Sequence, residues 1–194
     1  MKQQITKLAI ENAFLKLLQE RPFDKISVKD IVDECGVTRN TFYYHYDDIY
    51  SIIDDIMKRK LKEAIDLIGN DDLSWGDLFA SVMSFFTSNK QMTAHLFKSP
   101  KKDEVYYYID QSFELVVAHC VDSIDVDNKL KPEDRKLLID FYRYGLRGLI
   151  EAWVKNGMSY DLEKQLRETG AVFGEAAGNA IKKVISDMYR KERQ

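Results

Sequence analysis

The sequence predicts an all-α protein of about nine helices, in which an N-terminal three-helix module is joined by one long helix to a larger helical body. Apolar residues make up 45% of the 194 residues, and they recur at the three- and four-residue spacing of amphipathic helices. The chain has only three prolines and nine glycines, too few for the many turns of an all-β protein. We therefore expect two domains, residues 1–47 and 48–194.

The first three helices carry clear start and stop signals. Ser27 provides a hydroxyl cap for the second helix, and Asp30 stands three residues later, as a capping box requires. Gly36 can close that helix at low cost, because glycine readily adopts the left-handed conformation. Thr38 can then cap a third helix. The first helix is expected to end near residue 21. The second is expected to span residues 28–35 and the third residues 39–45.

The long linking helix and the helices of the body follow from similar signals. Asp47 and Asp48 are placed to cap the linking helix, whose isoleucines keep helical spacing until a turn at residues 69–72. Pro132, followed by two acidic residues, marks the start of another long helix that ends before Gly157. The helices of the body are expected at residues 74–87, 92–97, 103–121, 132–156 and 161–190.

Composition excludes several classes of protein. A formal charge of −3 gives no global attraction to nucleic acid, so any DNA contact must come from local placement. No apolar run approaches a membrane span and the N-terminus is amphipathic, so we expect a cytoplasmic protein without a membrane partner. Two distant cysteines outside any CxxC motif predict no disulfide, no metal and no cofactor. An enzyme is not expected, since no catalytic motif joins Cys35, Cys120, His45, His95 and His119.

The third helix is polar and aromatic, and only Phe42 in it is plainly apolar. In a DNA major groove, Arg39 can donate two hydrogen bonds to guanine, and Asn40 can pair with adenine or contact a phosphate. A threonine methyl can contact thymine, while tyrosine and histidine side chains can donate to phosphates. The alternative is that the tyrosines cover the core with their hydroxyls in solvent. A capped helix, a glycine turn and this short polar helix form a helix-turn-helix.

The segment of residues 38–46, T-R-N-T-F-Y-Y-H-Y, resembles the recognition helix of the TetR family of transcriptional regulators, which has the form T-R-x-T-x-Y-x-H-F. The resemblance extends back through residues 26–32 and covers about the first quarter of the chain. It implies a sequence-specific regulator of transcription that binds double-stranded DNA. Family members commonly carry a lysine at the start of the fourth helix, where this chain has Ile49, so that phosphate contact is not implied. The implied contacts are Lys29, Tyr43 and His45 at phosphates, with Thr38, Arg39, Asn40, Thr41 and Tyr44 nearest the bases.

The charge of the module and the glycines of the last two helices both bear on dimer formation. Residues 1–46 hold seven basic and six acidic side chains, a balance too weak for tight binding by a monomer. Glycine costs about 1 kcal/mol against alanine inside a helix, so glycines repeated at helical spacing predict a close helix–helix contact. The resemblance implies that the last two helices pair with those of a second copy, although the glycines can instead serve contacts within one subunit. The predicted homodimer interface comprises Gly145, Gly148, Ala152, Gly170, Gly174, Ala177 and Gly178.

The middle helices are rich in aromatic residues and methionine, which predict either a ligand pocket or an ordinary core. The leading hypothesis is a homodimeric repressor that binds a pseudo-palindromic operator and is released by a small hydrophobic or aromatic effector. One alternative is a regulator without a small-molecule ligand, acting as an activator or through a protein partner. Another is a helical adaptor that keeps the motif as a scaffold. The predicted pocket comprises Phe79, Met83, Phe86, His95, Tyr107, Phe113 and Trp153.

Overall fold

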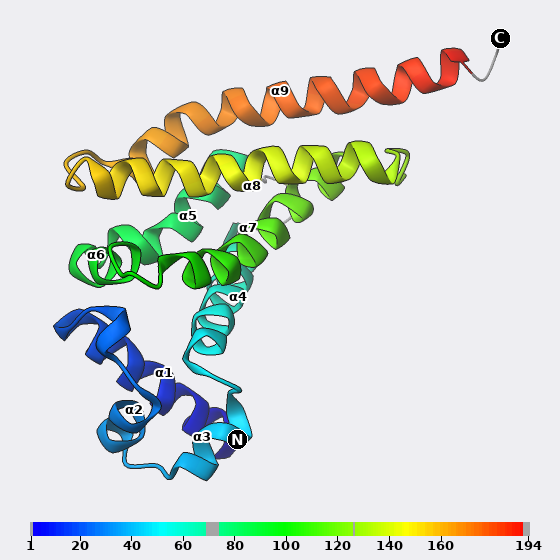
Figure 1. Cartoon of the computed structure of the whole chain (residues 1–194). Coiled ribbons are helices and arrows are strands. Elements are labelled where there is room, and N and C mark those ends of the chain that lie inside the picture. Colours follow the sequence, from blue (N-terminus) through cyan, green and yellow to red (C-terminus); the bar gives the residue numbers. More distant parts are fainter. Residues whose placement is uncertain (1, 69–73, 126, 192–194) are drawn as a thin grey trace.

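The computed structural model describes residues 2–68, 74–125 and 127–191, which form nine α-helices and one short 3-10 helix and contain no strand. A small module at one end is connected by α4 to a body in which α8 and α9 are the outermost helices (Figure 1). The all-α prediction is confirmed. The module contains α1 (Lys2–Glu20), η1 (Phe23–Lys25), α2 (Val28–Cys35) and α3 (Arg39–His45). The remaining helices are α4 (Ile49–Ile68), α5 (Trp75–Thr87), α6 (Lys90–Phe97), α7 (Lys102–Ile124), α8 (Pro132–Lys155) and α9 (Leu162–Lys191).

The helix bounds agree closely with those predicted from the sequence. The second and third helices have the predicted ends, and the hydroxyl of Ser74 caps α5 by accepting from the amide of Asp77. α6 begins two residues earlier than predicted, and α7 continues three residues further. The 3-10 turn η1 was not predicted; it follows Pro22 and buries the ring of Phe23 completely. The turn predicted at residues 69–72 lies outside the described residues.

Aromatic side chains join the module to the body. Phe23 contacts Phe14 at 6.2 Å and Tyr50 at 5.2 Å between ring centroids, and Tyr50 stacks on Tyr108 of α7 at 5.7 Å. On another side of the module, Nδ1 of His95 in α6 lies 2.8 Å from the carbonyl oxygen of Leu18 in α1. α4 packs against α1, α5 and α7. The module is therefore held directly through α4 and α6, and α7 is linked to it through Tyr50 of α4, so movement in the body can reach it.

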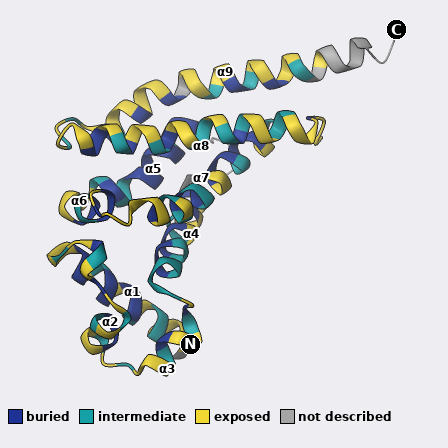
Figure 2. Cartoon of the chain, in the orientation of Figure 1, coloured by how far each residue is buried: buried dark blue, intermediate teal, exposed yellow. Residues whose placement is uncertain are grey.

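Within the body, α9 packs along α5 and α8 packs along α7. The close packing of α9 on α5 depends on Gly170 and Gly76, whose backbones are in direct contact. The hydroxyl of Tyr142 in α8 donates to the carbonyl oxygen of Phe173 in α9 at 3.3 Å, which links the two outer helices. Exposed residues run along the outward sides of both (Figure 2). No helix within the described ranges is long and apolar enough to cross a membrane.

Candidate nucleic-acid interface

The first helix of the helix-turn-helix, α2, is fixed at both ends. The amide of Asp30 donates to Ser27 Oγ at 3.3 Å, and the amide of Ser27 donates to Asp30 Oδ2 at 2.9 Å, so the predicted capping box is present. Hydrogen bonds from the side chain and backbone of Ser27 hold the pKa of the Asp30 carboxyl below its usual range. Gly36 closes the helix at φ 70° and ψ 24°, and the Val37 amide donates to the carbonyl of Val32 at 3.2 Å. This geometry sets the angle at which α3 leaves the turn.

We expect Gly36→Ala to lower the free energy of unfolding by about 1 kcal/mol, because a Cβ strains the left-handed conformation. Steric crowding is not the cause, since nothing lies within 4 Å of a Cβ built at Gly36. Gly36→Asn is the matched control, because asparagine tolerates this conformation and its loss should be smaller. Urea unfolding followed by circular dichroism measures both variants. Equal stability of Gly36→Ala and the parent protein would contradict the assigned turn.

The second helix, α3, is capped at its start and held by one buried ring. The amide of Thr41 donates to Thr38 Oγ1 at 3.1 Å, and the two threonine hydroxyls lie 2.9 Å apart. The hydroxyl of Thr38 is thus engaged in capping, which leaves its methyl group for an external contact. Phe42 is fully buried, and its ring lies 5.9 Å from that of the buried Tyr46. Because α3 is anchored through Phe42, its opposite side faces solvent.

The predicted DNA-contact residues of α3 share this outer side. Arg39 and Tyr43 are one helical turn apart, as are Asn40 and Tyr44, and all four are exposed. The ring of Tyr43 is 56% exposed. Tyr44 is 69% exposed, but its hydroxyl accepts a hydrogen bond from the side chain of Gln3 at 2.8 Å, which ties it to α1. Thr41 and His45 are half-buried at the edge of the same surface, and Lys29 is exposed on α2.

The basic side chains of the module fall into two groups. Four of them are neutralised within the protein, in the pairs Lys7–Asp55, Lys16–Glu34, Arg21–Asp30 and Lys25–Asp24. Lys29 and Arg39 make no ion pair with any residue that the structure describes. The side chain of Lys2 lies outside the described residues. The unpaired positive charge of the module is therefore concentrated on the predicted DNA-contact residues, despite a net charge near zero.

The start of α4 offers no additional cation at this surface. The amide of Ser51 donates to Asp48 Oδ1 at 2.8 Å, so Asp48 caps the helix as predicted. Asp47 is exposed beside it. Ile49, at the position where TetR-like proteins commonly carry lysine, is half-buried and packs against the core. The side chain at this position serves packing in this protein.

A buried polar network, absent from the sequence-based predictions, ties the end of α3 to α1 and α4. The hydroxyl of Tyr46 lies 3.2 Å from Glu11 Oε1 and 3.1 Å from Asp55 Oδ2. Glu11 is almost completely buried and pairs with Arg59, while Lys7 pairs with Asp55 at 2.6 Å. Burial, reinforced by the two carboxylates, raises the pKa of Tyr46 far above its usual value. One sequence signal points to this network: Glu11 stands in the apolar stripe of α1.

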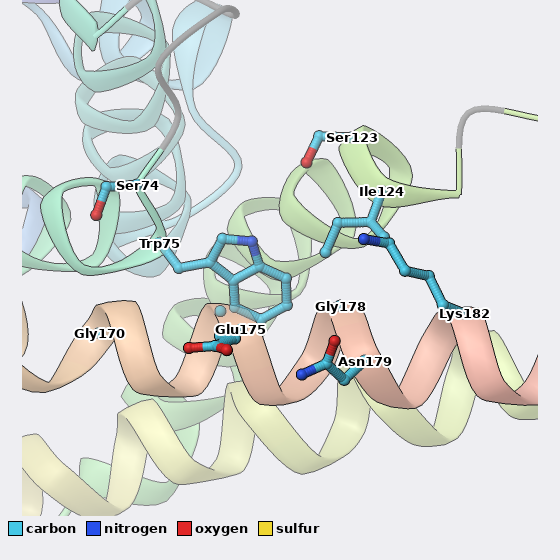
Figure 3. A pocket seen from close by; sticks show the side chains of 10 residues that line it. Ser74, Trp75, Ser123, Ile124, Gly170, Glu175, Gly178, Asn179 and Lys182 are labelled. Carbon is cyan, nitrogen blue, oxygen red and sulfur yellow. The ribbon is translucent and has the colours of Figure 1, made fainter.

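The structure corrects part of the predicted dimer interface. A Cβ at Gly170 would lie 2.0 Å from the Cα of Gly76, and one at Gly174 would lie 3.1 Å from the ring of Trp75. Ala177 is buried and a Cβ at Gly178 would lie 3.8 Å from Ile124, so Gly170, Gly174 and Ala177 of this stripe pack within their own subunit. The stripe also borders a groove of about 420 Å³, in which the Trp75 indole lies against α9 (Figure 3).

The predicted interface positions on α8 have a different environment. Gly145, Gly148 and Ala152 are exposed, and nothing lies within 4 Å of a Cβ built at either glycine. Large apolar side chains that the interface prediction did not include are exposed on the same two helices. This α8–α9 apolar face comprises Leu137, Phe141, Tyr144, Leu149, Val172 and Phe173.

The residues predicted to form an effector pocket do not come together as one. Phe79, Met83, Phe86, Phe113 and Trp153 are each at most 3% exposed and belong to the packed core. Tyr107, in contrast, is 62% exposed on α7. His95 is engaged with the backbone of α1. Aromatic residues at helical spacing here fill the core.

The cysteines and other potential metal ligands form no reactive centre in the described parts of the chain. Cys35 and Cys120 are free thiols, and burial raises the pKa of Cys120 to about 12. Cys120 is buried, whereas Cys35 is half-buried. Among the described residues, no group of three or more His, Cys, Asp and Glu side chains is arranged to hold a metal ion.

A helix-turn-helix with free cations on its exposed face, carried on an all-helical body, defines a DNA-binding regulator of transcription. Residues 11–56 match the model for bacterial regulatory proteins of the tetR family, and residues 74–172, just over half of the chain, match a transcriptional regulator C-terminal region. The chain belongs to the TetR family. Members of this family are transcriptional regulators and not enzymes.

Individual relatives agree with this assignment. The HTH-type transcriptional regulator YxbF of Bacillus subtilis strain 168 is 29% identical over 89 residues, which are 44% of this chain and 21% of that protein. The chain thus spans about a fifth of the length of this relative. The structure of the dihydroxyacetone kinase operon activator DhaS aligns over 91% of this chain and 97% of its own, with a TM-score of 0.61 and 18% identity. A TetR regulator from Streptococcus agalactiae 2603V covers 89% and 95% of the two chains, with a TM-score of 0.57 and 22% identity. The structural similarities establish the fold.

Proposed function

We propose that this regulator binds a pseudo-palindromic operator as a homodimer, with Arg39 and Asn40 contacting base edges and Lys29 and Tyr43 contacting phosphates. One observation carries the proposal: the unpaired cations of the described module, Lys29 and Arg39, lie with polar and aromatic side chains on the outer surface of the helix-turn-helix. Arginine and asparagine suit direct readout of bases in the major groove, and lysine and tyrosine suit phosphates. Tyr44 lies on the same surface, and Thr41 and His45 lie at its edge.

The dimer is proposed to form through the α8–α9 apolar face. An exposed apolar surface of this kind on two adjacent helices favours association with another protein surface. Leu137, Phe141, Tyr144 and Gly148 recur at helical spacing along one side of α8. The two open glycines allow a second helix to approach closely. Two modules joined in this way present two recognition helices, which compensates for the few cations of each.

We expect Phe141→Glu to convert the dimer to a monomer, because the 71% exposed ring of Phe141 is replaced by a charge that cannot be buried without a partner. Tyr107→Glu is the matched control: it also places glutamate at an exposed aromatic position, which lies on α7 outside the face. Sedimentation equilibrium measures both variants, and circular dichroism checks that each is folded. A dimer that survives Phe141→Glu, or a monomer produced by Tyr107→Glu, would place the interface elsewhere.

The operator is tested by selecting bound sequences from a random DNA pool at fixed salt. The expected product is an inverted repeat whose half-sites are roughly 10 base pairs apart between centres. Such a repeat reports sequence-specific binding and twofold symmetry in one measurement. A single asymmetric site would contradict the proposed dimer, and no enrichment would contradict the proposed DNA contacts.

We further propose that the protein is a repressor released by a small-molecule effector bound in the body. The contacts of α4 and α6 with the module support this, as does the stacking of Tyr108 in α7 on Tyr50 in α4, because an effector that favours one arrangement of these helices changes the placement of the recognition helices. The second candidate is a regulator without a small-molecule ligand, acting as an activator or through a protein partner. It is favoured by the tight core around Phe113 and Trp153 and by the similarity in fold to an operon activator.

A further inference from the structure

A cleft of about 470 Å³ opens between the turn that joins α6 to α7 and the C-terminal part of α8. Its walls include Phe97 and Val154, each only 5% exposed, and the half-buried ring of Tyr106. The rings of Phe97 and Tyr106 lie 5.6 Å apart between centroids. The cleft thus has an apolar, partly aromatic floor and is separate from the interior residues first predicted to bind an effector.

Three lysines surround this floor. Lys98, Lys102 and Lys155 line the cleft, and the one carboxylate among the lining residues is Glu151. Glu151 is already engaged, since it pairs with Arg147 at 3.4 Å. Lys98 and Lys102 have no ion-pair partner in the described part of the chain. Lys155 forms a longer ion pair with Glu151, at 4.0 Å. The cleft therefore carries an excess of positive charge that the protein does not neutralise.

Charge and shape together specify the kind of ligand. An apolar floor gains from covering an aromatic or alkyl group, and unpaired ammonium groups at the rim gain from an anionic substituent. A neutral apolar molecule would leave the ammonium groups unused, whereas a simple inorganic anion would leave the floor uncovered. We propose that this cleft binds a small organic anion that has an apolar body and a carboxylate, sulfonate or phosphate group.

The position of the cleft gives it a route to the helix-turn-helix module. Ser99, a buried lining residue in the turn after α6, lies beside the carboxylate of Asp24 in η1. One turn earlier in the chain, His95 contacts the backbone of Leu18 in α1. A ligand in the cleft thus borders a turn that lies against η1, and α6, directly before this turn, contacts α1. The inference deepens the proposed effector control and rests on it only for this regulatory consequence.

The binding test uses two fluorescent probes in the absence of DNA. 1-Anilinonaphthalene-8-sulfonate carries an aromatic body and an anionic group, and N-phenyl-1-naphthylamine has the same ring system without the charge. At 0.15 M salt, the double variant Lys98→Met/Lys102→Met is expected to bind the anionic probe about tenfold more weakly than the parent protein and the neutral probe equally well. Lys101→Met is the matched control, because Lys101 is exposed in the same turn but does not line the cleft.

Three outcomes would overturn the proposal. The first is that the double variant binds the anionic probe as tightly as the parent protein does. The second is that Lys101→Met loses as much affinity for the anionic probe as the double variant does. The third is that the double variant loses as much affinity for the neutral probe as for the anionic probe. The last outcome would show that the lysine stems, and not their charges, contribute to binding. A second measurement separates the cleft from effector control: the anionic probe should change operator affinity of the parent protein but not of the double variant. No change in the parent protein would contradict effector control through this cleft while leaving the binding result intact.

Discussion

Arg39→Ala should weaken binding to the selected operator by about a hundredfold or more, since a bidentate contact to a base contributes about 1–3 kcal/mol and a dimer loses two of them. Arg39 is exposed at the start of α3 and is not neutralised by any described carboxylate. The loss should be confined to the selected sequence, because a base contact distinguishes operator from other DNA. Fluorescence anisotropy with the operator and with a scrambled duplex, at one salt concentration, measures both affinities.

Two further variants make this measurement specific. Lys29→Ala should weaken binding to operator and scrambled DNA by the same factor and reduce the salt dependence, as expected for a phosphate contact. Lys16→Ala removes a cation from the same module, but Lys16 is paired with Glu34, so DNA affinity should change little. Arg39 does not contact bases if Arg39→Ala leaves the affinity for the operator unchanged. The same conclusion follows if Arg39→Ala weakens binding to scrambled DNA as much as binding to the operator.

Gly170→Ala should lower the free energy of unfolding by about 3 kcal/mol, which for a chain of this size corresponds to a decrease of about 10 °C in Tm. The added Cβ would lie 2.0 Å from the Cα and 2.6 Å from the amide nitrogen of Gly76, so the backbones of α5 and α9 must separate. No rotamer can relieve this contact, because both partners are main chain. Thermal and urea unfolding at matched protein concentrations measure the change.

Gly178→Ala provides the comparison, because it makes the same substitution in the same helix, where the new Cβ would meet only the side chain of Ile124, at an ordinary contact distance of 3.8 Å. Alanine there should raise the stability of the folded chain by about 0.5–1 kcal/mol through helix propensity alone. The two variants thus differ in sign although their chemistry is the same. Similar unfolding curves for both would mean that α9 does not approach α5 at Gly170.

The sequence predicted the helices well because their limits depend on local chemistry. The residues that start and end these helices act on backbone groups only a few positions away, so their effect can be predicted from the sequence alone. They are Ser27, Gly36, Thr38 and Pro132. The surface of α3 was predictable for the same reason, since Phe42 alone sets which side is buried. The confirmed parts of the prediction are those in which one helix determines its own geometry.

The remaining features depend on residues far apart in the chain. Glycines at helical spacing on α9 predicted that another helix packs closely against it. They did not predict that this contact is between Gly170 and Gly76, which lies more than ninety positions earlier in the chain. Glu11 and Arg59 pair across 48 positions, and neither residue alone predicts the other. The aromatic residues of the middle helices could line a cavity or fill a core, and only three-dimensional packing distinguishes these outcomes. The cleft beside Phe97 was missed because its lining comes from two distant segments, residues 97–106 and 151–155.

The ion pairs that neutralise four cations of the module affect how the protein partitions between its operator and nonspecific chromosomal DNA. These cations are Lys7, Lys16, Arg21 and Lys25. Affinity for arbitrary DNA comes almost entirely from counterions released at phosphates, and cations already neutralised within the protein release few of them. Chromosomal DNA, which offers roughly 10⁶–10⁹ competing sites, should therefore retain a small fraction of the molecules. A regulator built in this way can occupy its operator at low copy number, because few copies are lost to the rest of the chromosome.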